Sequence, residues 1–274
     1  MTSLLNFRNL RALVTDMDGV LLRGPEPLPG VADLFNFLHR RHIPFIIATN
    51  SSTKTPGEYR QRLADLGAEV VKKENILTSA LVTAAYLQQE FPTGGTVYVV
   101  GQPSIEAAIR TAGFTLLADA SQVADVVVVG GDPDLTYTKL KHAALHIQRG
   151  ARFIGSNPDV VYPTEEGLVP EAGTILAAIL AATGVAPLIM GKPERFLFEI
   201  AVAKLGSLPG QTVMLGDRLD TDILGGQRAG LKTILMTTGV DTEAAITVKG
   251  IQPDAVFGSL EALVAAWDHQ ANSL

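Results

Sequence analysis

The sequence predicts an α/β fold with a mostly parallel sheet. Short β-branched apolar runs recur along the chain, and helical patterns fill many of the gaps between them. Four consecutive valines at 126–129 are typical of a strand that is buried on both faces, as in a parallel sheet. Because parallel α/β sheets bind ligands at the carboxyl ends of their strands, we expect functional residues at those positions.

Nine apolar runs are predicted as strands. They are Ala12–Thr15, Pro44–Thr49, Thr96–Val100, Val126–Val129, Arg152–Gly155, Leu188–Met190, Thr212–Leu215, Thr233–Met236 and Ala255–Phe257. Helical spacing of apolar residues predicts helices at Val31–His39, Thr136–Arg149, Glu194–Leu205 and Asp222–Ala229. Polar or glycine-rich turns follow many of the strands, and four of these turns carry the residues discussed below.

The composition excludes several function classes. The 274 residues are 47% hydrophobic and 18% charged, which supplies enough apolar material for a folded core. The net charge of −6 argues against nucleic acid as the partner. Because the chain has no cysteine, it has no disulfides, thiolate metal sites or cysteine nucleophile.

The sequence favours a cytoplasmic protein without membrane partners. The N-terminus has no long apolar stretch behind a basic start, so we expect no signal peptide. Residues 172–191 carry no charge over about the length of a membrane span. Gly184 and Pro187 interrupt this stretch, so we expect a buried helix near 172–182, a turn and a short strand.

Two carboxylates follow the first predicted strand. Asp16 and Asp18 lie two residues apart, so in extended chain they project to the same side, and Gly19 allows a sharp turn after them. One carboxylate can attack phosphorus, and the other can protonate the leaving oxygen and then activate water. Two carboxylates this close need a cation to balance their charge, and a site with only oxygen ligands suits Mg²⁺.

Polar residues follow three other predicted strands. Asp217 is placed to complete a metal site with Asp16, whereas Asp222 either caps a helix or supports the metal shell. The segment 49–51 (Thr-Asn-Ser) suits a phosphate oxygen, with an ordinary helix cap as the alternative. Lys192 can neutralise phosphate charge and hold a nucleophilic carboxylate ionised. Together these groups supply what phosphoryl transfer needs.

In this order, the motifs resemble those of the haloacid dehalogenase (HAD) superfamily of phosphatases. DMDGVL at 16–21, TNSS at 49–52, GKP at 191–193 and GDRLDTDI at 216–223 are similar to its four motifs. The resemblance covers nearly the whole chain. It implies a Rossmann-like parallel-sheet core that acts on small phosphorylated metabolites.

The resemblance also implies roles for individual residues. Asp16 would be the nucleophile and Asp18 the general acid/base. Thr49 and Asn50, with Ser51 beside them, would bind the phosphoryl group, and Lys192 would balance its charge. The ligands of Mg²⁺ would be Asp16, the Asp18 backbone carbonyl and Asp217, with Asp222 in the outer shell or bound through water.

The spacing of the motifs predicts an inserted α/β domain, which the family resemblance implies is a cap of the C2 type. Thirty residues separate Asp18 from Thr49, which leaves no room for a cap, whereas about 140 separate Asn50 from Lys192. We expect core segments at 1–78 and 187–274 and a cap at 79–186. This arrangement resembles the NagD-like subfamily, whose caps often mediate dimers, so a homodimer is expected.

Other polar residues in the predicted cap leave two interpretations open. Asn157 and Asp159 lie in a loop that either contacts substrate or simply forms a turn. His142 and His146 have the i, i+4 spacing of a metal pair, but we expect a solvated or partly buried helix face.

The function expected from the sequence is a Mg²⁺-dependent phosphatase that hydrolyses small phosphomonoesters through an aspartyl-phosphate. Two alternatives remain. One is a phosphotransferase on the same scaffold, and the other is a non-catalytic protein that binds a phosphometabolite. The intact set Asp16, Asp18, Lys192 and Asp217 argues against the second alternative, because a binding protein does not need an acid/base.

Overall fold

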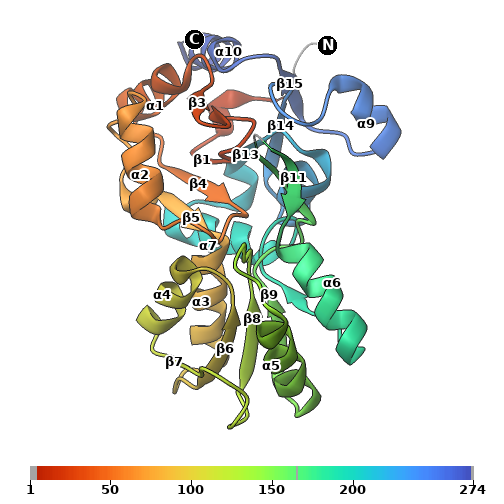
Figure 1. Cartoon of the computed structure of the whole chain (residues 1–274). Helices are drawn as coiled ribbons and strands as arrows, with labels where there is room; N and C mark the ends of the chain where they lie inside the picture. The colour runs from red at the N-terminus through yellow and green to blue at the C-terminus, as the bar shows by residue number, and fades with distance from the viewer. Residues whose placement is uncertain (1–4, 165, 273–274) are drawn as a thin grey trace. The chain divides into compact units, whose positions relative to one another are not determined.

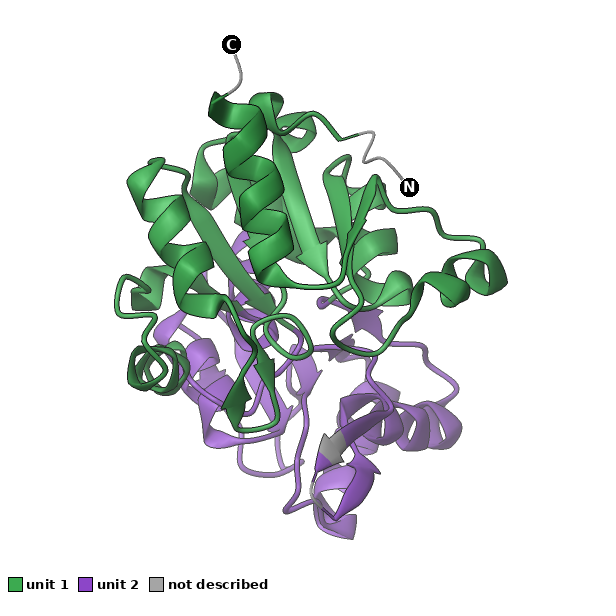
Figure 2. Ribbon diagram, turned by 90° about the horizontal axis from the view of Figure 1, so that it is seen from above, with its two compact units in different colours: residues 1–49, 56–77, 192–274 green, residues 50–55, 78–191 purple. Residues whose placement is uncertain are grey.

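The chain forms two compact units, each with its own sheet (Figure 2). A computed structural model describes residues 5–164 and 166–272. Unit 1 contains the described residues within Met1–Thr49, Pro56–Leu77 and Lys192–Leu274, and unit 2 contains Asn50–Thr55 together with those within Thr78–Gly191.

The sheet of unit 1 has β1 in its interior. Its six strands run in the order β15-β14-β13-β1-β4-β5 (Figure 1). Their bounds are β1 Ala12–Thr15, β4 Phe45–Thr49, β5 Ile76–Thr78, β13 Thr212–Gly216, β14 Lys232–Met236 and β15 Ala255–Phe257. Strand β1 pairs in parallel with both β4 and β13, so the chain leaves β1 to one side and later returns on the other. Such a switch in strand order is where α/β sheets place their ligands.

Helices and aromatic side chains cover this sheet. The helices of unit 1 are α1 Val31–Arg40, α2 Pro56–Asp65, α7 Arg195–Leu205, α8 Leu224–Arg228, α9 Glu243–Lys249 and α10 Leu260–Asn272. Helix α1 packs on α10. There Trp267 is 2% exposed, with its ring centroid 5.3 Å from that of Phe7 and 5.7 Å from that of Phe37. Trp267 is thus a packing residue of the unit 1 core.

A hairpin and four short helical turns complete the described part of unit 1. A two-stranded antiparallel hairpin, β2 Leu22–Arg23 and β3 Glu26–Pro27, follows β1. Turns of 3₁₀ helix lie at Phe7–Asn9, Lys73–Asn75 and Pro209–Gln211, and a π-helical turn at Leu219–Ile223 precedes α8.

Unit 2 has a second parallel sheet. Its strand order is β12-β9-β8-β6-β7, and every neighbouring pair is parallel. The strands are β6 Thr96–Val100, β7 Thr115–Leu116, β8 Val126–Val129, β9 Arg152–Gly155 and β12 Leu188–Ile189. All four valines of β8 are fully buried, because both faces of this strand are covered.

Helices and one hairpin complete unit 2. The helices are α3 Ser79–Glu90, α4 Pro103–Thr111, α5 Tyr137–Gln148 and α6 Ala172–Thr183, and the antiparallel hairpin is β10 Val161–Thr164 and β11 Gly167–Pro170. Helix α3 packs on α4, and α5 packs on α6.

The nine predicted strands are present to within one residue at each end, which confirms the α/β class. The predicted helix Asp222–Ala229 is wrong in its first turn, because residues 219–223 form the π-helical turn and α8 begins only at Leu224. The short strands β5 and β7 and both hairpins were not predicted. Runs of two to four residues show too little periodicity to be read from sequence.

The uncharged stretch 172–191 forms α6, a turn and β12, as predicted, but α6 is only partly buried, because Ile175 and Ile179 face the core whereas Leu180 is 39% exposed. Helix α6 ends at Thr183, and Gly184 follows in the left-handed conformation at φ 71°. Over the described residues, none of the helices has both the length and the apolar character that crossing a membrane would need.

Candidate active site

Neighbouring parallel strands bring Asp16 and Asp217 together. Thr15 of β1 is in register with Leu215 of β13, so the residues that follow both strands emerge at the same edge of the sheet. The backbone N–H of Asp16 donates to the carbonyl of Leu215 at 2.8 Å, which extends the ladder by one residue. Asp217 follows β13 directly and is 2% exposed.

The Asp217 carboxylate packs against the backbone of Gly19, which has no side chain. Gly19 has φ +82°, and a Cβ atom placed there would lie 2.2 Å from Asp217 Oδ2. This oxygen accepts a hydrogen bond from the N–H of Val240 at 2.7 Å. The glycine that ends the DMDG motif therefore serves the turn and also leaves room for the acid.

Asp222 is held by the π-helical turn rather than by a helix cap. It is fully buried, and its Oδ2 accepts from the backbone N–H of Arg218 at 3.1 Å. A Cβ atom on Gly216 would lie 2.1 Å from the Asp222 Cβ, so only glycine permits this approach. Asp222 is not the N-cap residue of α8, because it lies inside the preceding turn, and its carboxylate instead accepts from the N-cap residue of that turn, Arg218.

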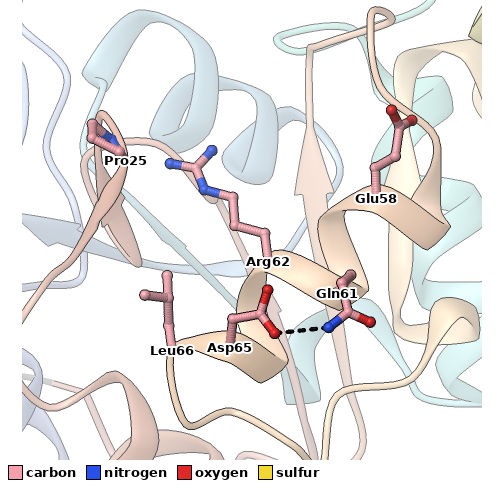
Figure 3. A pocket seen from close by; sticks show the side chains of 6 residues that line it. All are labelled: Pro25, Glu58, Gln61, Arg62, Asp65 and Leu66. Carbon is pink, nitrogen blue, oxygen red and sulfur yellow. Dashed lines mark hydrogen bonds between the residues drawn. The ribbon is translucent and has the colours of Figure 1, made fainter.

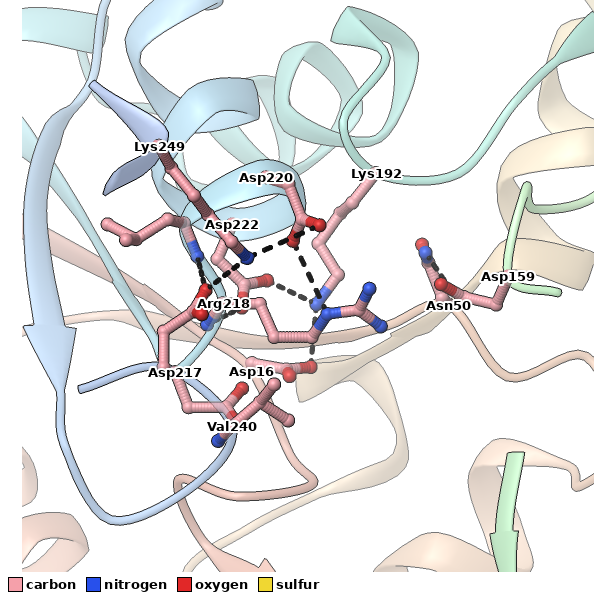
Figure 4. A network of polar contacts seen from close by, with 12 residues as sticks. Asp16, Asn50, Asp159, Lys192, Asp217, Arg218, Asp220, Asp222, Val240 and Lys249 are labelled. Atoms are coloured by element: carbon pink, nitrogen blue, oxygen red, sulfur yellow. Dashed lines mark hydrogen bonds and ion pairs between the residues drawn. The ribbon is translucent and has the colours of Figure 1, made fainter. Parts of the chain in front are cut away.

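Lys192 joins two of the acids. Its Nζ lies 2.6 Å from Asp16 Oδ1 and 2.7 Å from Asp222 Oδ1 (Figure 4). It also donates to the carbonyl of Ala48 at 3.1 Å. The lysine is 2% exposed. A charge buried to this degree is stable only with such partners, so Lys192 orders both carboxylates.

The three acids form a group that could hold a cation. Asp16, Asp217 and Asp222 each offer an oxygen atom within 4.8 Å of the others. Asp217 Oδ1 is buried and has no hydrogen-bond partner among the described residues. A buried carboxylate oxygen without a donor is costly, and an oxygen-binding cation would satisfy it. The donor set therefore fits a hard divalent ion. Asp18 is half-buried at the adjacent turn.

Burial sets the protonation of this group. It raises the pKa of Asp16 above its usual range, although Lys192 opposes the shift. Burial, followed by the charges of Asp222 and Asp16, raises the pKa of Asp217 to about 8. Burial raises the pKa of Asp222 to about 6. Burial alone would lower the pKa of Lys192, but the two carboxylates outweigh it and raise that pKa. Negative charge is thus in excess, which also favours a cation.

The predicted phosphate-binding residues stand at the end of β4. Thr49, 2% exposed, is its last residue, and Asn50 and Ser51 follow in the short segment 50–55 that clusters with unit 2. In that unit Asn157 is fully buried, and Asp159 accepts from the Asn50 side chain at 3.0 Å. The structure therefore brings Asn50, Asn157 and Asp159 together.

Asp241 is a residue that sequence reasoning missed. It is 5% exposed, and its Oδ2 accepts from the Leu219 N–H at 2.7 Å and from Lys249 Nζ at 2.9 Å. Its own N–H donates to the carbonyl of Asp217 at 3.0 Å. Asp241 thus orders the turn between Asp217 and Asp222. Its position just beyond the end of β14, a carboxyl end like the others, could have identified it.

A cavity in unit 1 and a buried histidine in unit 2 are not members of the acidic cluster. A cavity of about 380 Å³ runs along α2 between Pro25 and Leu66, where Gln61 donates to Asp65 at 2.7 Å (Figure 3). His146 is fully buried rather than solvated. Its Nδ1 accepts from the Ala124 N–H at 3.1 Å, and its Nε2 lies 3.2 Å from the carbonyl of Asp119.

Comparisons with known proteins identify the family. A haloacid dehalogenase-like hydrolase model matches residues 13–115, and a HAD-hydrolase-like model matches 189–263. An acid sugar phosphatase of Staphylococcus epidermidis is 36% identical over 258 residues, which is 94% of this chain and 98% of that protein.

Solved structures agree over almost the whole chain. A p-nitrophenyl phosphatase from Archaeoglobus fulgidus is 30% identical with a TM-score of 0.88, covering 94% of this chain and 99% of the other. NagD from Escherichia coli K-12 is 31% identical with a TM-score of 0.85, covering 92% and 97%. With the parallel sheets and the buried acidic triad, these matches show that the chain belongs to the haloacid dehalogenase-like hydrolases, among the capped phosphatases of the NagD type.

Proposed function

We propose that this protein is a Mg²⁺-dependent phosphatase that hydrolyses small phosphomonoesters through an aspartyl-phosphate on Asp16. The observation that carries the proposal is the geometry around Lys192. One buried ammonium contacts Asp16 and Asp222, while none of the described residues donates a hydrogen bond to Asp217 Oδ1. Phosphoryl transfer depends on such charge balance and positioning.

Asp16 is the best placed nucleophile of the three acids. Its side chain is 12% exposed, whereas the side chain of Asp222 is fully buried. Lys192 contacts Oδ1 and favours the ionised form, which is the attacking form. Attack by a carboxylate oxygen of Asp16 on phosphorus forms the acyl-phosphate as the ester oxygen leaves. Asp18, two residues along the turn, protonates that oxygen, so the products are an alcohol and the phosphorylated aspartate.

Water then completes the cycle. Asp18, now ionised, takes a proton from water as the hydroxide oxygen attacks phosphorus. The acyl-phosphate bond breaks, orthophosphate leaves and the Asp16 carboxylate is restored. The half-buried position of Asp18 supports this role, because an acid/base must exchange protons with solvent between the two steps.

Mg²⁺ would be held by Asp16, Asp217 and the backbone carbonyl of Asp18, with Asp222 in the outer shell or bound through water. When bound, it supplies positive charge for the phosphoryl oxygens and the cluster of acids. Thr49, Asn50, Ser51 and Lys192 would bind the phosphoryl group. The position of Thr49 at the end of β4, the strand beside β1, supports this assignment.

We further propose sugar phosphates and aryl phosphates as substrates, because relatives that match almost the full chain carry the names acid sugar phosphatase and p-nitrophenyl phosphatase. The homodimer and the cytoplasmic location expected from the sequence stay predictions. Light scattering on the purified protein tests the first, and fractionation of cells tests the second.

The experiment is steady-state hydrolysis of para-nitrophenyl phosphate with Mg²⁺ and with EDTA, for wild type, Asp16→Asn and Asp18→Asn. We expect turnover that needs Mg²⁺ and is lost in Asp16→Asn. Brief incubation with ³²P-labelled substrate should label the wild type but not Asp16→Asn. Label retained in Asp16→Asn would exclude Asp16 as the nucleophile.

The same assay separates the two alternatives. Added alcohols that accept the phosphoryl group and increase product formation would indicate a phosphotransferase. Binding of a sugar phosphate with no release of orthophosphate would indicate a binding protein instead of an enzyme.

A further inference from the structure

We propose that Asn157 and Asp159 are positioning residues that hold Asn50 in place, rather than residues that contact substrate. The inference rests on the proposed function in one respect, namely that Asn50 binds the phosphoryl group. All three residues belong to unit 2, so the contacts between them lie within one unit.

The side chain of Asn157 is fully engaged inside the protein. It is 0% exposed, and its Nδ2 donates to the carbonyl of Asn50 at 2.8 Å and to Ser156 Oγ at 3.4 Å. Its Oδ1 accepts from the backbone N–H of Asp159 at 3.0 Å. A buried amide whose donors and acceptor are used in this way acts through the groups that it holds.

Asp159 holds the other end of the same residue. The Asn50 Nδ2 donates to Asp159 Oδ2 at 3.0 Å, as the pair drawn in Figure 4 shows. Because Asn157 also fixes the Asp159 backbone, one loop after β9 determines both the main chain and the side-chain rotation of Asn50. A carboxamide with one hydrogen-bonded end has a defined orientation of its other polar atom.

Close packing against Gly191 also helps to hold the Asn50 side chain in place. A Cβ atom on Gly191 would lie 2.6 Å from Asn50 Oδ1 and 3.1 Å from the Asn157 Cβ. The side chains of Asn50 and Asn157 therefore occupy the space that any other residue at position 191 would fill. Asn50 is 9% exposed as a result.

Two further anchors hold the segment that starts at Asn50. Ser79 Oγ, at the first residue of α3, donates to the carbonyl of Asn50 at 2.6 Å. Ser52 is fully buried, and its Oγ accepts from the backbone N–H of Gly131 at 3.3 Å. The segment is therefore held by hydrogen bonds to α3, to Gly131 and to the loop that carries Asn157 and Asp159.

This arrangement predicts an effect that does not depend on the leaving group. Asn50 would contact the phosphoryl group, which all substrates and the product orthophosphate share. Loss of its positioning should weaken binding of each of them by the same factor. A substrate-contacting Asp159 would instead act on the alcohol part, which differs between substrates and is absent from orthophosphate.

The test compares Asp159→Ala, which removes the acceptor, with Asp159→Asn, which removes the charge but keeps an oxygen acceptor for Asn50. Asp134→Ala is the matched control, because it removes an exposed carboxylate from the loop after β8. The measurements are KM and kcat for para-nitrophenyl phosphate and for a hexose phosphate, and the inhibition constant of orthophosphate, all with Mg²⁺.

For Asp159→Ala we expect both KM values and the orthophosphate inhibition constant to rise by a common factor of about tenfold, the size of one lost hydrogen bond to a positioned group. The value of kcat should change much less, and Asp159→Asn should restore most of the binding. A rise confined to one substrate, with orthophosphate unaffected, would show direct substrate contact and overturn the proposal.

A second measurement does not require activity. Hydrogen exchange of peptides that cover residues 50–55 should be about tenfold faster in Asn157→Asp and Asp159→Ala than in wild type, and unchanged in Asp134→Ala. Unchanged exchange in both loop variants would overturn the proposal. If the wild type hydrolyses none of the substrates, the proposed function fails, and this comparison still decides whether the loop positions Asn50.

Discussion

At the residue scale, Lys192 balances two buried carboxylates with a single positive charge. Its Nζ lies within 2.7 Å of both Asp16 and Asp222. Removing one partner of a buried ion pair leaves the other charges without compensation, which usually costs more than the pair contributes. Loss of Lys192 alone should therefore destabilise the protein, whereas loss of Lys192 together with one carboxylate charge should destabilise it less.

We expect Lys192→Met to lower the free energy of unfolding in EDTA by about 3–5 kcal/mol, because two buried carboxylates lose their cation. Urea denaturation followed by circular dichroism measures this value. The double variant Lys192→Met/Asp222→Asn should recover part of the loss. If the double variant is no more stable than the single one, the charge argument is wrong.

Asp217 offers a second prediction at this scale. Mg²⁺ in excess should raise the Tm of the wild type, because it binds only the folded carboxylates, and 100 times the dissociation constant corresponds to about 2.7 kcal/mol. Asp217→Asn should abolish most of this rise, because it removes the buried carboxylate whose Oδ1 has no donor within residues 5–164 and 166–272. A thermal melt with and without Mg²⁺ measures the effect. An undiminished rise in the variant would place the ion elsewhere.

The pH dependence of the metal-free protein follows from the same residue. The folded-state pKa of Asp217 is raised from 3.8 to about 8, so folding favours its protonated form. Its contribution to stability is therefore present at low pH and is lost as the pH rises from about 4 to about 8. In EDTA, Asp217→Asn should lose less stability than the wild type over this range. Parallel stability profiles would contradict the prediction.

At the scale of elements, the buried side chain of His146 connects helix α5 to the segment before β8. Helix α5 carries His146, whose Nδ1 accepts from the Ala124 N–H in the segment before β8. With that acceptor in use, the neutral ring donates from Nε2 to the carbonyl of Asp119. Burial lowers the pKa of His146 below 6.5, which keeps the ring neutral in the folded protein.

We therefore expect stability to decline as the pH falls below about 6.5. The unfolded histidine gains a proton there while the folded one resists, so His146 contributes a slope of up to about 1.4 kcal/mol per pH unit down to its folded pKa. His146→Gln should flatten this part of the profile in denaturant titrations between pH 7 and 5. His142→Gln, on the same helix, is the control, and an equal effect in both variants would contradict the assignment.

The elements that were hardest to predict are the shortest or the least regular. The strand β7 has two residues, and the π-helical turn at 219–223 replaces the helix start that the sequence suggested. That turn exists because Asp222 bonds back to the Arg218 N–H and fits against Gly216, both of which are tertiary details of the site.

At the scale of the whole molecule, two sheets with separate cores share one chain. The core around Trp267 belongs to unit 1, and that around Val127 and Phe153 belongs to unit 2. The three carboxylates that could hold a metal ion, Asp16, Asp217 and Asp222, all lie in unit 1. Their ligand should therefore stabilise the two units to different extents.

Hydrogen exchange with mass spectrometry tests this expectation. Mg²⁺ should slow exchange in the peptides that contain residues 16–19 and 216–223, because binding of the ion orders these turns. The β8 peptide, inside the sheet of unit 2, should show little change. Equal protection throughout the chain would mean that the ion acts on global unfolding instead.

The sequence by itself determined the α/β class, the nine main strands and the four strand ends that carry Asp16, Thr49, Lys192 and Asp217, because buried parallel strands and their polar ends leave a local pattern. Only the tertiary structure decided which charges meet. It paired Lys192 with Asp222 and left Asp217 Oδ1 without a donor in the part of the chain that the structure describes. It also put Asp241 and Asp159 in contact with backbone and side chains far away in sequence. Such contacts depend on strand order and close packing, which no local pattern records.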